Sequence, residues 1–92
     1  MIIYNVTVKI EKDILKDWEE WMTKAHIPDV MATNCFTDAQ LRRLLMEEED
    51  GITFSVQYRC ESMEKLHQYQ TTHAARLQAE HSERYKGRYV AF

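Results

Sequence analysis

Two stretches of the chain alternate apolar and polar residues with a period of two. In the first, Ile2 to Ile10, every even-numbered residue is apolar and most of the residues between them are polar. The second stretch, Ile52 to Arg59, repeats the alternation, with Ile, Phe, Val and Tyr at the even positions. Side chains of a strand point alternately to its two faces, so the pattern predicts two strands that each bury one face.

Between these strands, apolar residues return at intervals of three and four, which is typical of a helix with one buried face. They are Ile14, Leu15, Trp18, Trp21, Met22 and Ala25. Asp13 precedes them and is the expected N-cap. Pro28 disfavours helical geometry at Ile27, so we expect the helix to end near His26. One further turn is expected from Asp29 to Thr33.

A weaker pattern predicts the second strand, from Phe36 to Met46, where three leucines stand among polar residues. The part from Ala39 to Met46 also fits a helix, and both interpretations stay open. An acidic run, Glu47 to Asp50, is followed by Gly51 and predicts a solvated turn, because Asp-Gly supports positive φ. This turn would join the second and third strands in a hairpin.

A second helix is expected after the third strand, with Ser62 as its N-cap. Its apolar stripe consists of Met63, Leu66, Tyr69 and Leu77. A continuous helix to Tyr85 would be longer than the strands beneath it, so we expect a break near Thr71 and Thr72. Gly87 would end the helix, and Arg88 to Phe92 is the expected last strand.

The predicted order is therefore strand, helix, two hairpin strands, helix and strand. This is the ferredoxin-like βαββαβ arrangement, an α+β fold in which a four-stranded antiparallel sheet carries its helices on one face. The sequence contains no linker and no repeat, so a single domain over residues 1–92 accounts for the whole pattern.

The sheet face that the helices leave uncovered has an unusual composition. Its central residues are short and uncharged: Asn5, Thr7, Thr53, Ser55 and Gln57. A face open to bulk water usually carries more Lys and Glu. We therefore expect these residues to form a homodimer interface in which two sheets pack together. The alternative is a solvated sheet face rich in threonine, a residue with high strand propensity.

Composition and charge narrow the possible partners and the compartment. The 92 residues carry a formal net charge of -3, which gives no basic excess for nucleic acid or an anionic membrane. The amino terminus lacks a signal-peptide pattern, and no segment has the roughly 20 apolar residues of a membrane span. We expect a cytoplasmic protein in which Cys35 and Cys60 are reduced and no metal is bound.

A family resemblance rests on six segments spread over nearly the whole chain. They are Met1–Thr7, Trp18–Met22, His26–Thr33, Gly51–Tyr58, Leu77–His81 and Arg84–Phe92. Together they resemble a small bacterial family catalogued as domain of unknown function four-two-eight-six. The resemblance implies a dimeric α/β barrel of ferredoxin-like protomers, a group that also holds cofactor-independent monooxygenases, small isomerases, haem-processing proteins and ligand-sensing domains. It assigns no catalytic residue to this chain.

Four residues are candidates for acid–base chemistry. His73 and His81 fall on the side of the second helix that carries its apolar stripe, because eight residues make nearly a whole number of turns. His26 and Asp29 lie where the first helix is expected to end. An imidazole beside a carboxylate at such a position is a possible general base. The alternative is structural, with boundary histidines bonded to backbone or water and a capped turn around Pro28.

Four aromatic residues are candidates for contacts with a ligand. Tyr4 and Tyr58 are expected to bound a cleft between the helices and the sheet. Trp18 and Trp21, three residues apart, are expected to pack in the core, in the dimer or around the cleft. At least one indole N–H must find a partner or stay exposed.

The sequence contains no activated nucleophile, metal cluster or glycine-rich phosphate loop. This favours a non-catalytic homodimeric domain that binds a small molecule or regulates a partner, with no cofactor. The alternative function is a cofactor-independent monooxygenase or isomerase with a histidine as the acid–base group in the helix–sheet cleft. A haem-binding protein with one axial histidine is a third possibility.

Overall fold

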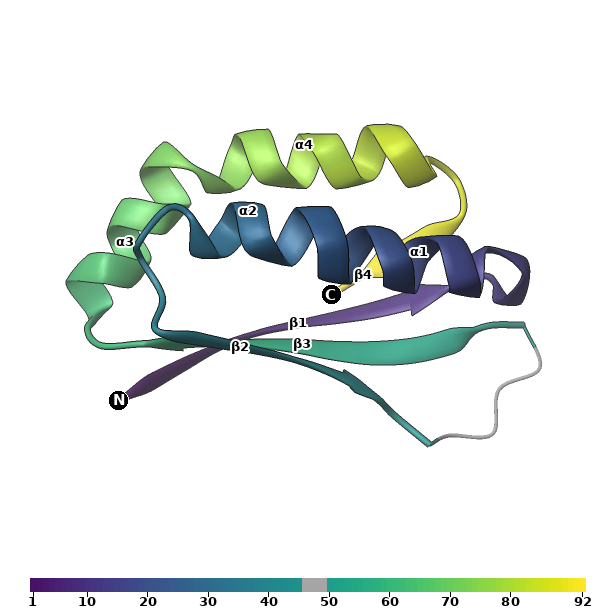
Figure 1. Cartoon of the computed structure of the whole chain (residues 1–92), viewed down its shortest axis with the longest axis horizontal. Coiled ribbons are helices and arrows are strands. Elements are labelled where there is room, and N and C mark those ends of the chain that lie inside the picture. The colour runs from purple at the N-terminus through teal and green to yellow at the C-terminus, as the bar shows by residue number, and fades with distance from the viewer. Residues whose placement is uncertain (46–49) are drawn as a thin grey trace.

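The computed structural model describes residues 1–45 and 50–92, which form one antiparallel sheet with helices on one face (Figure 1). The strands are β1 (Ile2–Ile10), β2 (Asp38–Arg43), β3 (Ile52–Cys60) and β4 (Tyr89–Ala91). The first helical segment comprises η1 (Lys12–Ile14), α1 (Leu15–Trp21), η2 (Met22–His26) and α2 (Ile27–Met31). The second comprises α3 (Met63–Thr72) and α4 (Ala74–Tyr85).

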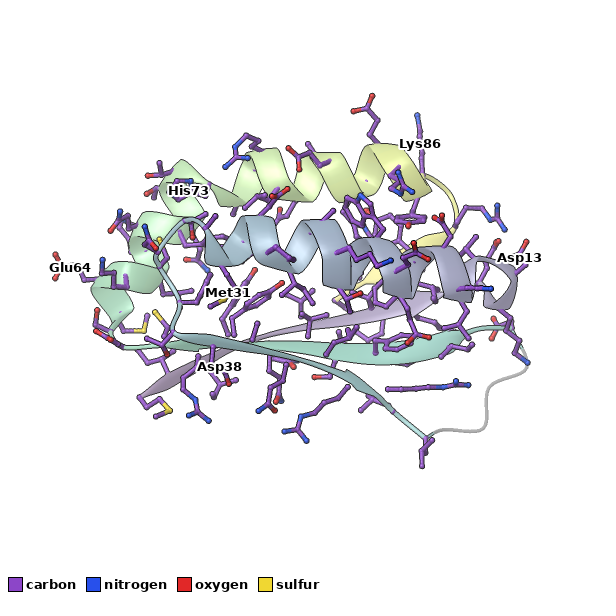
Figure 2. All side chains as sticks on the ribbon, in the orientation of Figure 1. Asp13, Met31, Asp38, Glu64, His73 and Lys86 are labelled. Atoms are coloured by element: carbon purple, nitrogen blue, oxygen red, sulfur yellow. The ribbon has the colours of Figure 1, made fainter. Side chains whose placement is uncertain are left out.

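The strand order β2-β3-β1-β4 is that of the predicted ferredoxin-like fold. β1 and β3 pair along their whole length, from Ile2 opposite Cys60 to Ile10 opposite Ile52. This register places the even-numbered residues of both strands on the helix side, where Figure 2 shows side chains filling the space between the two layers. Val8, Phe54 and Val56 are each at most 4% exposed there. The predicted alternation and its buried face are therefore confirmed.

The first helical segment differs from the prediction at both ends. Asp13 does not act as an N-cap, because Glu11 occupies that position without a side-chain bond and Asp13 instead bonds to Arg88. The segment also does not end at His26 but continues through Pro28 to Met31.

A π-helix, η2, explains how the segment passes through the proline. The N–H of Ile27 bonds to the carbonyl of Met22, five residues back, so the backbone is widened by one residue just before Pro28. Proline lacks the N–H of an α-helical bond, and its ring crowds the carbonyl four residues back. Such a bulge is one of the usual irregularities by which a helix accommodates local misfit.

The second helical segment follows the prediction closely. Ser62 is its N-cap, with its hydroxyl oxygen accepting a bond from the N–H of Lys65 at 3.2 Å. The expected break near Thr72 is present, because α3 ends there and His73 separates it from α4. Gly87 follows the helix with a φ of 77°. Met63 was wrongly included in the buried stripe, since it is 64% exposed at the first turn.

β2 is shorter than predicted and β4 is an edge strand. β2 is a strand rather than a helix, but it covers only Asp38–Arg43, and Met46 lies outside the described residues. Most of the predicted acidic turn, residues 47–49, also lies outside them. Glycine is needed at position 51 because a Cβ there would lie 2.8 Å from the carbonyl oxygen of Ile10. The expected positive φ is not the reason, because Gly51 does not adopt one.

β4 leaves half of the neighbouring edge of β1 open. It pairs only with Val8 to Ile10, and Phe92 adds two backbone bonds to Thr7 at 2.9 and 3.1 Å. Residues of an antiparallel strand direct their backbone groups alternately to either neighbour. The N–H and C=O groups of Ile3 and Asn5 therefore face the open part of this edge. Among the described helices, none is long and apolar enough to cross a membrane.

The Ser62 cap gives a direct test of the second helical segment. Ser62→Ala removes the acceptor for the Lys65 N–H and should lower the free energy of unfolding by about 1 kcal/mol. Urea denaturation measures the change. Ser82→Ala, at an exposed position within α4, is the matched control and should not destabilise the protein. Equal effects of the two substitutions would contradict the capping role.

Candidate functional site

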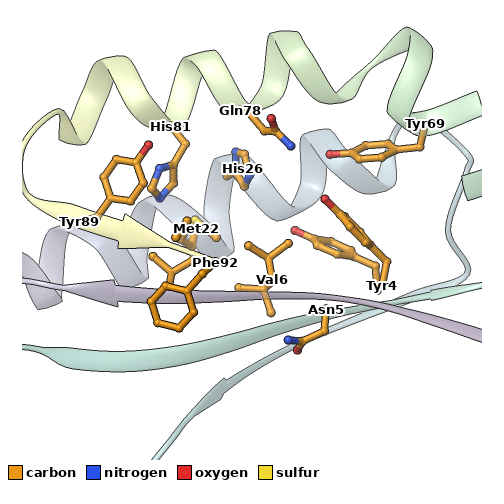
Figure 3. A pocket seen from close by; sticks show the side chains of 14 residues that line it. Tyr4, Asn5, Val6, Met22, His26, Tyr69, Gln78, His81, Tyr89 and Phe92 are labelled. Carbon is orange, nitrogen blue, oxygen red and sulfur yellow. The ribbon is translucent and has the colours of Figure 1, made fainter. Parts of the chain in front are cut away.

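A cavity of about 390 Å³ lies between the helices and the sheet, next to the short strand β4 (Figure 3). Its middle is apolar and is lined by Val6, Val8, Met22, Val56 and Ala91. Tyr4 and Tyr69 lie at one end of it, and His81 and Tyr89 lie at the other. This arrangement, an apolar space with a few polar groups, is typical of small-molecule sites.

Three tyrosines form the first end of the cavity. Tyr4 comes from β1, Tyr58 from β3 and Tyr69 from α3, and all three line the space. Their rings are held by mutual packing and by Phe36, whose centroid lies 5.1 Å from that of Tyr58 and 4.8 Å from that of Tyr69. Figure 3 shows the hydroxyl groups of Tyr4 and Tyr69 directed toward the cavity.

The phenols of Tyr58 and Tyr69 are neutral hydrogen-bonding groups. Burial raises the pKa of Tyr58 well above its usual range and raises the pKa of Tyr69 to about 12, with the neighbouring tyrosines adding to both shifts. Within the described part of the chain, the hydroxyls of Tyr4, Tyr58 and Tyr69 have no hydrogen-bond partner. They are therefore free to bind oxygen or nitrogen atoms of a ligand.

His81 of α4 lies at the opposite end of the cavity. Its Nε2 atom accepts a hydrogen bond of 2.9 Å from the indole Nε1–H of Trp18, a fully buried residue of α1. The ring of Tyr89 is nearly perpendicular to the imidazole, with the centroids 4.5 Å apart. His81 is only 8% exposed, and Figure 3 shows it beside Tyr89 at the cavity wall.

His26 reaches the cavity because η2 is a π-helix. Its ring stacks on Trp21 with centroids 5.0 Å apart, although the two residues are five positions apart. In an α-helix, residues five apart point about 140° away from each other. The wider π-helical turn brings both rings to one side and places His26 5.8 Å from His81.

Both histidines are neutral near pH 7. Burial lowers the pKa of His81 from 6.5 to about 4, and the nearby His26 lowers it further. Burial also lowers the pKa of His26, against the opposing charges of Glu80 and Asp29. Nδ1 of His26 is the one side-chain nitrogen or oxygen in the described residues that is buried without a hydrogen-bond partner.

The structure brings together four of the eight residues expected at a site. His26, His81, Tyr4 and Tyr58 line the cavity, whereas His73 and Asp29 do not. His73 lies between α3 and α4, 6.4 Å from the Tyr69 ring, and Asp29 is exposed on α2. The expectation that His26 lies at a helix end is wrong, because η2 and α2 form one continuous segment there.

The two tryptophans lie behind the cavity wall. Trp18 packs against Phe54 at 4.7 Å and donates to His81, which provides the partner that a buried indole needs. Trp21 supports His26, and the guanidinium group of Arg84 lies 5.5 Å from its ring. Both tryptophans therefore position a histidine without lining the cavity themselves.

Sequence reasoning missed several lining residues. They are Met22, Tyr69, Gln78, Tyr89 and Phe92. Tyr69 and Met22 stood in the predicted apolar stripes, where nothing distinguishes a residue that lines a cavity from one that packs in the core. Tyr89 could not be predicted as a lining residue because β4 is short, and three residues show no clear alternation.

The five residues expected at a dimer interface do lie together on the uncovered sheet face. Asn5 is opposite Gln57, and Thr7 is opposite Ser55. The side chain of Ser55 donates to Asn5, which donates to Thr7 at 3.1 Å. Thr53 and Ser55 are 4% and 7% exposed in the single chain. Figure 3 shows the side chain of Asn5 on the side of β1 opposite to that of Val6, although Asn5 also borders the cavity.

Comparison with known proteins identifies the family and the fold. A family model described as a domain of unknown function, DUF4286, matches residues 1–92, as the six resembling segments implied. The chain is also similar to the crystal structure of an ethyl tert-butyl ether d (EthD) family protein from Bacillus halodurans, with a TM-score of 0.65. That match is 14% identical in sequence and covers 100% of this chain and 95% of the other, so it shows the ferredoxin-like fold.

No functionally curated protein matches the chain. Among the described residues, no group of three or more His, Cys, Asp or Glu side chains is placed to hold a metal ion.

The lowered pKa of His81 predicts a dependence of stability on pH. Between pH 6.5 and about pH 4 the unfolded chain binds a proton at His81 that the folded chain does not bind. The free energy of unfolding should therefore decrease as the pH falls through this window. His81→Gln keeps an acceptor for Trp18 and should weaken this decrease in urea titrations. His67→Gln, exposed on α3, should behave as wild type, and identical curves for all three proteins would contradict the assignment.

Proposed function

The chain belongs to the DUF4286 family, whose domain has no known function, and we propose that it is a homodimeric protein that binds a small, flat, largely apolar molecule. The observation that carries this proposal is the cavity of about 390 Å³ between the helices and the sheet. Binding rather than catalysis is the function that its lining supports best.

The polar groups of the cavity support a ligand-binding role. Three tyrosine hydroxyls at one end and two neutral imidazoles at the other lack enough protein partners, and buried polar groups are normally hydrogen-bonded. A ligand with an apolar body and polar atoms at its ends would satisfy them. The aromatic rings around these groups favour a flat molecule, because aromatic faces and edges pack well against another ring.

The cavity lies beside the edge of β1 that pairs with β4. β4 covers only part of this edge, and the cavity is lined there by Tyr4, Val6 and Phe92. Phe92 is 74% exposed, so its side chain lies at the rim rather than in the core.

The uncovered sheet face supports the proposed homodimer. The side chains of Asn5, Thr7 and Ser55 bond to one another within the chain, so a partner sheet would cover these groups without leaving them unpaired. Ile3 and Val90 share this face through their pairing with Arg59 and Lys9, and they are 49% and 58% exposed. Two copies related by a twofold axis would bury these apolar side chains.

An acid–base enzyme, a cofactor-independent monooxygenase or isomerase, is the second candidate. The observation that favours it is the pair of neutral imidazoles, with centroids 5.8 Å apart, at the end of an apolar cavity. Recovery of a bound compound unchanged after aerobic incubation would separate binding from turnover. A haem-binding role fits His81 poorly, because its Nε2 already accepts the bond from Trp18.

Partly filling the cavity should weaken binding. Val6 is a half-buried residue at the centre of the cavity wall, and Val6→Phe should weaken binding of a neutral naphthalene such as 2-ethylnaphthalene at least tenfold by occupying its space. Isothermal titration calorimetry measures the affinity. Ala79→Phe adds a phenyl ring at an exposed position of α4 and serves as the control, for which affinity should be unchanged. Equal affinities of both variants would count against this cavity as the binding site.

A charge in the uncovered face should dissociate the proposed dimer. Light scattering should give the wild type about twice the 11.0 kDa of one chain. Gln57→Arg places a cation in the middle of the face, where the two copies would repel each other across a twofold axis. Gln70→Arg introduces the same change at an exposed position of α3 and should leave the dimer intact. A monomeric wild type at micromolar concentration would refute the homodimer.

A further inference from the structure

We propose that the ligand presents a neutral carbonyl oxygen to Nδ1–H of His81, because the hydrogen bond from Trp18 makes this nitrogen the donor at the histidine end of the cavity. This inference rests on the proposed ligand-binding function. It identifies the chemical class as an aryl ketone or a related conjugated carbonyl compound.

The direction of the Trp18–His81 bond determines the tautomer of the imidazole. An indole nitrogen can only donate a hydrogen bond, so Nε2 of His81, 2.9 Å away, must be the acceptor. A neutral imidazole with an acceptor at Nε2 carries its proton on Nδ1. His81 is therefore a hydrogen-bond donor through Nδ1.

The surroundings of Trp18 stabilise this tautomer. The indole is 0% exposed and its ring is held against Phe54, with centroids 4.7 Å apart, so no water can replace His81 as its partner. A proton on Nε2 would place two N–H groups against each other and leave the indole without an acceptor. The lowered pKa of His81 agrees with this, since protonation is disfavoured in the buried site.

The Nδ1–H group of His81 needs an acceptor from outside the described chain. No hydrogen bond from it to any described residue exists, although the residue is only 8% exposed. His26 Nδ1 is the only fully buried unpartnered nitrogen or oxygen among the described side chains, so Nδ1 of His81 keeps some accessible surface. Because His81 lines the cavity, we infer that a ligand atom placed there can accept its proton.

The charge and shape of the surroundings select the kind of acceptor. Among the described residues that line the cavity there is no Lys or Arg, so a carboxylate or phosphate would be buried without a counter-charge. A neutral carbonyl oxygen avoids that cost. The rings of Tyr89 and His26, with centroids 4.5 and 5.8 Å from that of the imidazole, favour an aromatic group next to that carbonyl.

A matched pair of probes tests the inference. The probes are 2-acetylnaphthalene and 2-ethylnaphthalene, which differ in that a carbonyl replaces a methylene group. Calorimetry at pH 7 should show that the wild type binds the ketone about five- to tenfold more tightly, as expected for one additional hydrogen bond. Long-range ¹H–¹⁵N spectra of the same protein should show His81 protonated at Nδ1 and not at Nε2.

A variant of Trp18 separates its effect from simple occupancy of the cavity. Trp18→Phe removes the donor to Nε2, so His81 should populate both tautomers and the preference for the ketone should fall toward unity. Met63→Leu, at an exposed position of α3 that does not line the cavity, keeps the Trp18–His81 bond and should keep the preference. If Trp18→Phe does not fold, the wild-type spectra and the two wild-type probe affinities alone test the inference.

Each other outcome overturns a different statement. If both probes bind wild type equally, the cavity binds apolar molecules and the proposed function stands, but His81 is not the donor that selects a carbonyl. A proton on Nε2 of His81 overturns the inference in the same way. If neither probe binds, the proposed function fails together with the inference that rests on it.

Discussion

The alternation of apolar and polar residues along β1 and β3 is the constraint on which the rest of the molecule depends. Pairing along the full length of these two strands gives the sheet one apolar side, and the helices can bury their own stripes only there. Core and cavity therefore share one side of the sheet. The polar network of Asn5, Thr7 and Ser55 occupies the other side. The cavity and the proposed dimer face are therefore separated by the thickness of the sheet.

On the helix side, two buried polar groups satisfy each other by a hydrogen bond. An indole N–H in the core of a small domain costs stability unless it meets an acceptor. His81, 63 residues away in the chain, provides that acceptor for Trp18 and joins α1 to α4. The same bond leaves the opposite nitrogen of the imidazole as a donor beside the cavity. One hydrogen bond therefore both satisfies a polar group in the core and orients a residue of the candidate site.

The sequence predicts the fold well where a local pattern is enough, as in β1, β3 and the Ser62 cap. It fails where a contact distant in the chain outweighs the local preference, as when Asp13 bonds to Arg88 instead of capping a helix. The ending at His26 was wrongly predicted because a proline rule assumes an α-helix, and the π-helix before Pro28 has different requirements. The histidines were identifiable as candidates. Their partners were not, because the Trp18–His81 and Trp21–His26 contacts depend on tertiary packing and on helix register.

Because of the π-helix, a relative can keep the residues of this site and still lose their arrangement. A π-turn is an α-helix with one residue inserted, so its effect is carried by the length of the segment between Trp21 and Pro28 rather than by any one side chain. A homologue that kept both Trp21 and His26 but lost one residue between them would have a regular helix. Its imidazole would turn away from the tryptophan, and an alignment would still show both aromatic residues as retained. In this family, a one-residue gap in the first helical segment is therefore as informative about the position of His26 at the cavity as the replacement of that histidine.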